Sequence, residues 1–278
     1  TQGRVHQRAW RDSFREKIRG KMVSMGYMDT HNLAFISTQH FDKMRLPESD
    51  GLRSAIAILN PLSSAEGLLR TSLLPSLLDA LGRNSRRLNP RAALFEIARG
   101  FVPQLPDPLK CERPLLAGGG YGPWAEGWLA SKTDYDFFDA KGAVEELLDY
   151  VGVEGFSFKP VEVPFLQSGR SAAVMVQDDT IGIFGEVHPE TADAFSIKER
   201  TAVFELDLEA LLRNSSPTQA GFSVPSSYPP VVRDISLIAD HQTPAGQILS
   251  EMKKIGGKHL ERLFLQDVFT GGKIPVGK

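Results

Sequence analysis

Apolar residues recur every three or four positions along the first part of the chain, which predicts an amphipathic helix. Basic and acidic side chains occupy much of the remaining helix surface. Gly26 follows the last apolar position and predicts the end of the helix. The apolar stripe consists of Trp10, Phe14, Ile18, Met22 and Met25.

Two further helices are predicted from the same periodicity. Over about Thr71–Asn84, five leucines fall at relative positions 0, 1, 4, 5 and 8, which is one wide stripe. Pro75 lies in the first turn, where a proline is tolerated. Another helix begins near Ala140, with apolar residues at positions 0, 3, 4 and 7 counted from Val144.

Short apolar or alternating runs between these helices predict strands. Two of them, Ala172–Val176 and Ile181–Gly185, are joined by a polar stretch of four residues, which is typical of a hairpin. Proline-rich 103–110 and glycine-rich 118–127 are expected to be loops. The other predicted strands are Leu33–Ile36, Ala55–Leu59, Ala92–Ile97, Leu115–Ala117 and Ala202–Leu208.

A change in composition divides the chain. Residues 214–227 are rich in serine and proline and lack periodicity, so we expect a linker between a core at 1–213 and a smaller domain at 228–278. In the smaller domain, Asp234–Ala239 and Leu260–Phe269 are predicted strands.

A helix between these two strands is indicated by Thr243 as cap, Pro244 at its first position and Gly256 just past its end. Strand, helix and strand form half of a split βαβ domain, which is expected to be incomplete within this chain.

Composition narrows the class of protein. The 278 residues are 41% apolar and 24% charged, which is typical of a soluble globular protein. The net charge of −2 restricts any RNA-binding surface to a local patch. The single cysteine, Cys111, excludes an internal disulfide and thiolate metal sites. Because no apolar run approaches the ~18 residues of a membrane span, we expect a cytoplasmic protein without a membrane partner.

Several motifs follow one another in an order that resembles the β subunit of bacterial-type phenylalanyl-tRNA synthetase. Each motif alone is weak, but their joint order and spacing make a strong signal. They are LNPLSSAEGLLRTSLLPSLLDALGRN (59–84), LFEIARGF (94–101), DFFDAKG (136–142), SGRSAAV (168–174), GIFGEVHPE (182–190), FELDLEALL (204–212), YPPVVRDISL (228–237) and DVFTGGKIPVGK (267–278).

The resemblance implies an α+β fold, with a class II aminoacyl-tRNA synthetase-like antiparallel sheet and flanking helices. An incomplete ferredoxin-like anticodon-binding domain would follow the sheet. It further implies a non-catalytic scaffold in an α2β2 phenylalanine–tRNA ligase, which charges tRNA(Phe) with phenylalanine using ATP. The α subunit and tRNA(Phe) would be the partners of this chain. ATP and Mg²⁺ would bind the α subunit, and editing would belong to domains without a counterpart here.

The residues themselves argue against adenylation by this chain. Class II adenylation uses an arginine on a strand beside an acid to hold the ATP α-phosphate. Here Glu96 has Leu94 two positions before it, where the arginine would stand. The glycine-containing strand Ile181–Gly185 is followed by Glu-Val-His-Pro, and not by Glu-Arg opening a helix. We therefore assign no catalytic residue.

Other candidate sites have structural interpretations. GGGYG (118–122) lacks the GK[ST] of a P-loop and is better interpreted as a loop. Asp134, Asp136 and Asp139 suggest a magnesium cluster, but acids are also favoured at a helix start. His188 before Pro189 is interpreted as a turn. No metal site is predicted.

Candidate interfaces complete the prediction. A basic set in the smaller domain is assigned to RNA, with an ordinary solvated surface as the alternative. Four arginines after the leucine helix, at 83, 86, 87 and 91, face either tRNA phosphates or acids of a partner, and the sequence does not separate these two. The RNA set is Arg233, Lys253, Lys254, Lys258 and Arg262, and the expected interface with the α subunit is Trp10, Phe14, Ile18, Leu73 and Leu77. The alternatives to a scaffold subunit are an autonomous class II-like ligase, an amino-acid-binding paralogue and a free-standing RNA-binding module.

Overall fold

A computed structural model describes residues 2–61, 67–103, 111–124, 133–216, 228–240 and 243–269, with side chains from residue 11 onward. The chain divides into two compact units, Thr1–Gln219 and Ala220–Lys278. The division falls inside the stretch 214–227 that the sequence predicts to be a linker.

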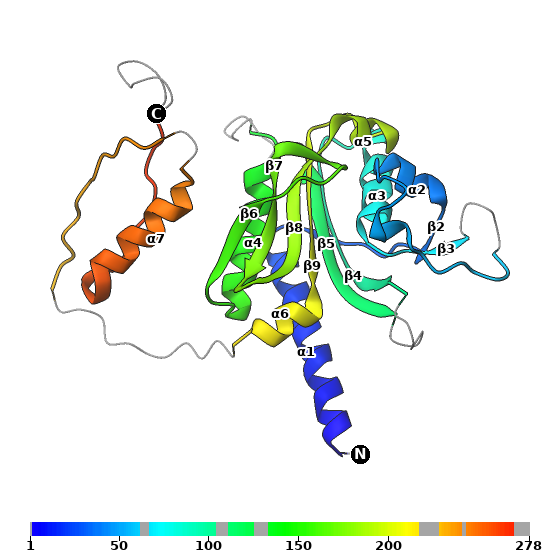
Figure 1. Ribbon diagram of the computed structural model, residues 1–278, viewed down its shortest axis with the longest axis horizontal. Helices are drawn as coiled ribbons and strands as arrows, with labels where there is room; N and C mark the ends of the chain where they lie inside the picture. The colour runs from blue at the N-terminus through cyan, green and yellow to red at the C-terminus, as the bar shows by residue number, and fades with distance from the viewer. Residues whose placement is uncertain are drawn as a thin grey trace. The chain divides into compact units, whose positions relative to one another are not determined.

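A seven-stranded sheet forms the centre of the first unit, in the order β1-β4-β5-β9-β8-β7-β6 (Figure 1). Neighbouring strands are antiparallel except for the edge strand β1, which pairs parallel to β4. The predicted hairpin is confirmed as β7 and β8, whose strands extend beyond the predicted runs. The strands are β1 (Met28–Asp29), β4 (Ala92–Phe101), β5 (Glu112–Tyr121), β6 (Phe156–Pro160), β7 (Leu166–Val176), β8 (Asp179–Val187) and β9 (Thr201–Asp207).

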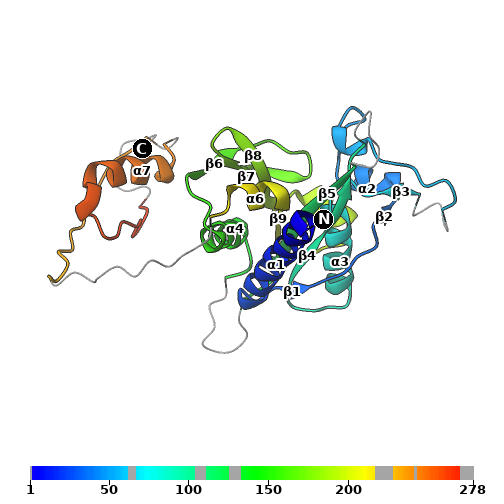
Figure 2. The ribbon, with the colours of Figure 1, turned by 90° about the horizontal axis from the view of Figure 1, so that it is seen from below.

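Helices cover both faces of this sheet, as the two views in Figures 1 and 2 show. On one face lie α1 (Gln2–Ser24), α4 (Phe137–Val151) and α6 (Leu208–Asn214), and on the other lie α2 (Thr38–Lys43), α3 (Leu74–Arg86) and α5 (Pro189–Ala194). Alternate residues of one strand serve the two layers: Leu115 packs with α3 and Leu116 with α1 and α4. Both sides of the sheet are therefore hydrophobic cores.

The three long helices confirm the periodic patterns of the sequence. The helix α1 ends at Ser24, and Gly26 follows with a left-handed φ of +90°. The helix α4 begins three residues before the predicted start, because the Asp136 carboxylate accepts hydrogen bonds from the Phe138 and Asp139 backbone N–H groups. Its last turn is closed by Gly152 in the left-handed region.

The predicted loop at 118–127 is wrong in its first part, because Gly118, Gly119 and Gly120 lie inside β5. A Cβ atom on Gly118 would lie 2.3 Å from Cζ of Phe204 on the neighbouring strand β9. The glycines thus make room for large side chains across the sheet rather than providing a flexible turn. The tract 103–110 lies outside the described residues except for Pro103.

Two further short elements form a small second sheet. Here β2 (Phe35–Ile36) pairs with β3 (Leu68–Leu69), beside the 3₁₀ turn η1 (Gly51–Arg53). The predicted strand Ala55–Leu59 is wrong: within the described residues, its one bridge is from Ala57 to Leu68, and no ladder extends from it. A single bridge leaves most of this segment without a ladder partner, so no strand forms.

In the second unit, the described residues contain α7 (Ala245–Gly256) and the 3₁₀ turn η4 (Gly257–His259). Pro244 is the N-cap rather than the first helical residue, and Gly256 is the last residue of the helix rather than the one beyond it. The predicted strands Asp234–Ala239 and Leu260–Phe269 are wrong for this structure, since both segments are irregular. Their apolar side chains, such as Ile235 and Phe269, are exposed instead of packing in a sheet.

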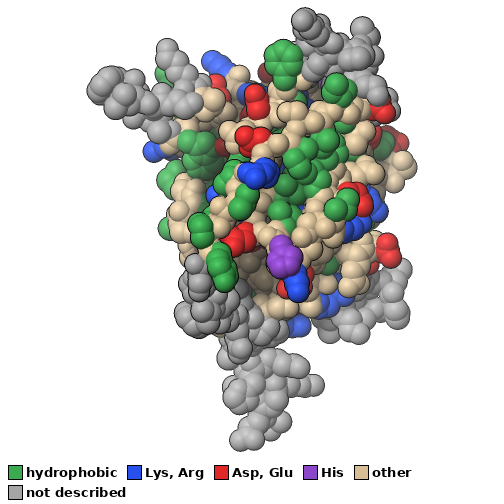
Figure 3. Space-filling view, turned by 90° about the vertical axis from the view of Figure 1, so that its left-hand side faces the viewer, with side chains coloured by type: hydrophobic (Ala, Val, Ile, Leu, Met, Phe, Trp, Pro, Cys, Tyr) green, Lys and Arg blue, Asp and Glu red, His purple; other side chains and the backbone are tan. Residues whose placement is uncertain are grey.

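On the face shown in Figure 3, hydrophobic side chains gather most densely near the centre, and others are scattered around them. Among the described residues of the second unit, the exposed large apolar side chains are Tyr228, Val231, Val232, Ile235, Leu237, Ile238, Ile255, Leu260, Phe264, Leu265, Val268 and Phe269.

Candidate functional site

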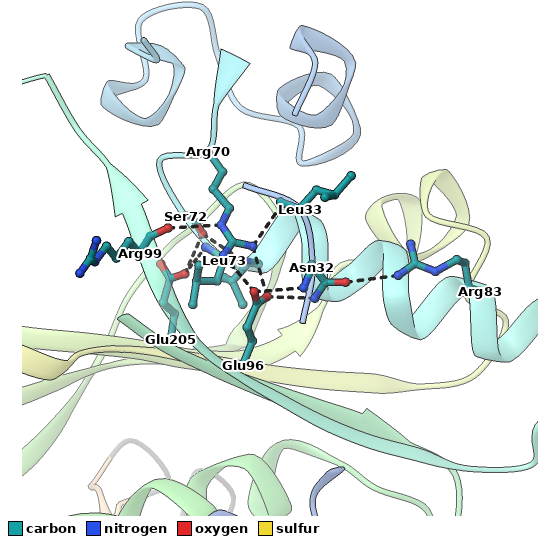
Figure 4. A network of polar contacts seen from close by, with 10 residues as sticks. Asn32, Leu33, Arg70, Ser72, Leu73, Arg83, Glu96, Arg99 and Glu205 are labelled. Atoms are coloured by element: carbon teal, nitrogen blue, oxygen red, sulfur yellow. Dashed lines mark hydrogen bonds and ion pairs between the residues drawn. The ribbon is translucent and has the colours of Figure 1, made fainter. Parts of the chain in front are cut away.

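A buried ion pair lies where the α3 layer meets the sheet (Figure 4). The guanidinium of Arg70 donates to both carboxylate oxygens of Glu96, at 2.9 Å for Nη2–Oε1 and 3.2 Å for Nη1–Oε2. The side chains are only 3% and 2% exposed. Arg70 also donates to the backbone carbonyls of Leu33 and Arg99. Its donors are therefore used inside the protein.

The carboxylate of Glu96 is saturated from its other side by Asn32. The backbone N–H of Asn32 donates to Oε1 at 3.2 Å, and its side-chain Nδ2 donates to Oε2 at 2.9 Å. The Asn32 carbonyl oxygen in turn accepts a hydrogen bond from Arg83 of α3. One chain of contacts thus joins β4, the segment after β1 and the last turn of α3 (Figure 4).

A second carboxylate, Glu205 of β9, anchors the start of α3. Its Oε2 accepts hydrogen bonds from the Leu73 backbone N–H at 2.6 Å and the Ser72 hydroxyl at 2.9 Å. Removal from water raises the pKa of Glu205, although these two donors and the charge of Arg113 oppose the rise. The carboxylate positions the helix start against the sheet.

These contacts decide what Glu96 can do chemically. A guanidinium that holds an ATP phosphate must present free donors to a cleft. Arg70 is buried and donates four hydrogen bonds inside the protein, so its guanidinium is not directed at a cleft. Arg70 was missed in the sequence because it precedes α3 instead of standing two positions before Glu96. Its place in the Arg-Thr-Ser motif was the available signal.

The acid after the glycine-containing strand β8 is also saturated. Glu186 is 2% exposed and accepts hydrogen bonds from Arg170, Arg200 and the backbone N–H of Phe137. Burial alone would raise its pKa, but the hydrogen bonds from Arg200 and Arg170 lower the pKa below the ordinary value. The two arginines are about half exposed, at 49% and 46%. This cluster fastens β7 and the start of β9 to the start of α4.

The acidic and histidine candidates have structural roles. Asp136 and Asp139 form a reciprocal capping box at the start of α4, in which Asp139 accepts from the Asp136 backbone N–H. His188 is the N-cap of α5, and its Nδ1 accepts a hydrogen bond from the Glu190 backbone N–H. The helix-start and turn interpretations are thereby confirmed. Among the described residues, no group of three metal-ligating side chains comes together, and Cys111 is a partly exposed free thiol.

The expected apolar interface is corrected by the packing of the first unit. Phe14 and Ile18 lie in the core between α1, α4 and the sheet, at 8% and 0% exposure. Leu73 and Leu77 are fully buried on the other face of the sheet. These four side chains already fill this chain's own cores and offer no surface to a partner. The side chain of Trp10 lies outside the described residues.

The five basic residues assigned to RNA are all exposed in the second unit. Lys253 and Lys254 occupy the last turn of α7, and Lys258 lies in the adjoining turn η4. The guanidinium of Arg262 stacks over the Phe264 ring, 4.8 Å from its centroid. Lys253, Lys254 and Lys258 therefore lie on two adjoining helical elements, whereas Arg233 lies on the separate segment before α7.

The described helices include none long and apolar enough to cross a membrane.

Comparison with known proteins gives two family matches along the chain. Residues 1–208 match the family described as Phenylalanyl tRNA synthetase beta chain CLM domain. Residues 226–278 match the Ferredoxin-fold anticodon binding domain. The first match covers most of the chain and includes the whole seven-stranded sheet.

Curated relatives named phenylalanine–tRNA ligase β subunit agree with these matches. The protein of Clostridium acetobutylicum is 34% identical over 259 residues, covering 92% of this chain and 31% of the relative. The protein of Geobacter sulfurreducens is 34% identical over 277 residues, covering 98% of this chain and 34% of the relative. The protein of Bacillus licheniformis is 37% identical over 220 residues, covering 78% of this chain and 27% of the relative. The chain spans about a third of the length of the relatives it matches most fully, and it belongs to the phenylalanyl-tRNA synthetase β chain family.

Proposed function

We propose that this chain is the non-catalytic core of a phenylalanine–tRNA ligase β subunit. In this role it supports a separate α subunit, which binds ATP and Mg²⁺ and activates phenylalanine. The assembled enzyme is an α2β2 tetramer that charges tRNA(Phe) in the cytoplasm. The chain itself contributes a rigid sheet and part of the tRNA contact.

The observation that carries this proposal is the closed Arg70–Glu96 pair. An adenylating site needs a guanidinium directed at the α-phosphate during attack. In this chain the guanidinium beside the strand acid faces that acid, two backbone carbonyls and no solvent. The second acid, Glu186, is buried and paired with Arg170 and Arg200, whose side chains are about half exposed. Both positions serve the stability of the sheet, which suits a scaffold.

The sheet supports a class II synthetase-like architecture. It is antiparallel apart from one parallel edge strand, and that strand directly follows the long helix α1. Such an arrangement places α1 and β1 at one boundary of the domain, where the dimer-interface motif of such enzymes would stand.

The partner contact is best placed on this boundary. The end of α1, the edge strand β1 and the segment after it expose Val23 at 54%, Met28 at 57% and Leu33 at 63%. Phe35 adds a further side chain that is 41% exposed. Exposed apolar side chains on neighbouring segments are typical of a protein interface. In the proposed contact with the α subunit, these exposed side chains take the place of the buried residues that the sequence pattern had suggested.

For RNA, the support lies in the second unit. Its match to an anticodon-binding family and the exposed run Lys253, Lys254, Lys258 and Arg262 favour contact with tRNA phosphates. Cations at the last helical turn are also favoured by the helix dipole, so binding must be tested directly.

Assembly with the catalytic partner tests the proposal. The chain is mixed with the separately purified α subunit from the same organism, and the mass of the complex is measured by light scattering after size-exclusion chromatography. A stable complex containing both chains is expected. Two proteins that elute separately at micromolar concentration would refute the scaffold role of this chain.

A further inference from the structure

The last turn of α3 and the residues after it carry an unusual concentration of positive charge. Arg83, Arg86, Arg87 and Arg91 are all exposed, within nine positions of one another. Lys198 is exposed on the neighbouring loop, and its backbone N–H donates to the Ser85 hydroxyl. The α3 basic cluster is defined as Arg83, Arg86, Arg87, Arg91 and Lys198.

The cluster is held in place by its surroundings. Arg83 donates to Asn32, which is itself fixed by Glu96. Arg86 donates to the backbone carbonyl of Phe195. The loop that carries Phe195 lies so close to α3 that a Cβ on Gly82 would come within 2.0 Å of this carbonyl oxygen. The cations therefore project from a rigid base.

The fold does not require so many like charges here. One cation at a helix C-terminus is favoured by the helix dipole, but like charges three or four residues apart repel one another. Arg83 lies three positions before Arg86 and four before Arg87. The nearest acid on the helix, Asp79, is engaged by His40 and Lys43. No carboxylate in the described parts of the chain forms a salt bridge with these three arginines.

Acidic groups beside the cluster do not neutralise it. Glu199 accepts the hydroxyl hydrogen bond of Ser85 at 2.6 Å, and its exposure is intermediate. Counting Glu199 and Asp79 against Arg83, Arg86, Arg87 and Lys198 alone leaves a surplus of two positive charges. Since the whole chain carries a net charge of −2, this surplus is a local feature of the surface.

We propose that the α3 basic cluster is a second RNA-contact surface, which binds the phosphate backbone of tRNA on the first unit. The proposal rests on the proposed function, which brings a tRNA to this protein. Guanidinium groups bind phosphate with two donors at once, and exposed arginines on a rigid base lose little freedom on binding. A polyanion matches the surplus positive charge of Arg83, Arg86, Arg87 and Lys198 better than an apolar protein surface does.

Fluorescence anisotropy with labelled, unfractionated tRNA tests this surface over a series of salt concentrations. The variant is Arg86→Gln/Arg87→Gln in the full 278-residue chain. The matched control is Lys159→Gln/Arg213→Gln, which removes two exposed cations from β6 and the end of α6. Thermal unfolding of each variant shows whether the fold is kept.

The first variant should weaken binding roughly tenfold or more near 0.1 M salt, with the slope of log Kd against log salt reduced by about 1.4–1.8. The control should leave both quantities unchanged. Equal losses in variant and control, or no salt-dependent binding by the parent chain, would overturn the proposal.

Two further arms separate this surface from the second unit and from a protein partner. If only Lys253→Gln/Lys254→Gln weakens tRNA binding, the cluster is not an RNA surface while the role of the second unit stands. Poly-L-glutamate is used as a probe for the alternative ligand of the cluster, an acidic protein segment. If Arg86→Gln/Arg87→Gln weakens poly-L-glutamate binding and leaves tRNA binding intact, the cluster belongs to an acidic protein segment and the proposal fails.

Discussion

Arg70 and Glu96 face each other in a two-pronged ion pair, with Nη2–Oε1 and Nη1–Oε2 distances of 2.9 and 3.2 Å and almost no exposure to solvent. The pair joins the segment before α3 to strand β4. It converts the one acid that resembles an ATP-site residue into a structural contact. The non-catalytic role proposed for this chain rests on this ion pair.

Breaking this pair should destabilise the first unit strongly. Glu96→Ala leaves the Arg70 charge buried without its partner, which typically costs about 3–5 kcal/mol. Urea unfolding measures the loss. The matched control is Glu112→Ala, which removes the partner of Arg99 in a pair that is 53% and 47% exposed. It should change stability by less than about 1 kcal/mol. Similar losses in both variants would mean that the buried pair is not a structural anchor.

Gly118 in the sheet and Gly142 in α4 should respond in opposite directions to a single added methyl group. Gly118→Ala places a Cβ 2.3 Å from the Phe204 ring, and relieving the clash should cost about 1–3 kcal/mol. Gly142 lies within α4 with nothing within 4 Å of an added Cβ. Gly142→Ala should therefore stabilise the protein by about 0.5–1 kcal/mol. Thermal unfolding compares the two, and a stable Gly118→Ala protein would contradict the packing described for β5.

The loss of folding stability at acid pH should depend on Glu186. Because its pKa is lower in the folded protein, the unfolded chain binds the proton first as pH falls. The stabilisation is complete above the unfolded value of about 4.3 and is lost as pH falls through the lower folded pKa. Glu186→Gln should flatten the rise of stability between about pH 3 and 5. Urea midpoints across pH 3–7 measure this, with Glu190→Gln as the control at a side chain that is 71% exposed.

Glu205 should change the pH dependence of stability in the opposite direction, measured by the same urea midpoints. Its pKa is raised by burial, so the folded protein binds the proton more tightly than the unfolded chain. Stability then falls as pH rises from the unfolded pKa through the folded one. Glu205→Gln removes this fall and keeps an oxygen that can accept from Leu73 and Ser72. A variant that loses stability more at pH 7 than at pH 4 would contradict the assignment.

The exposed boundary beside β1 should govern assembly with the α subunit. Met28→Glu and Val23→Glu place a charge on side chains that are 57% and 54% exposed, so folding should be unaffected. Binding to the α subunit should weaken at least tenfold, because an unpaired charge would be buried in the interface. The control is Leu59→Glu, at a side chain that is 95% exposed. Titration calorimetry that shows equal affinity for all three variants would exclude this boundary.

The helices of the core could be predicted from the sequence because their apolar stripes face a continuous sheet. Periodicity could not show that both helix layers bury their stripes within the chain, so Phe14 and Leu77 were assigned to a partner interface although they lie in this chain's own cores. Gly118 was assigned to a loop, because a glycine that accommodates Phe204 from another strand has no local signature. Arg70 was missed for a related reason: its partner Glu96 is 26 positions away, and only the fold brings them together.

The central claim is that this chain supports phenylalanine activation without performing it. Phenylalanine-dependent ATP–pyrophosphate exchange by the purified chain tests this most directly, with the α-containing holoenzyme as the positive control. The account predicts exchange no faster than the blank for the chain alone and robust exchange for the holoenzyme. Robust phenylalanine-dependent exchange by the chain alone would contradict it.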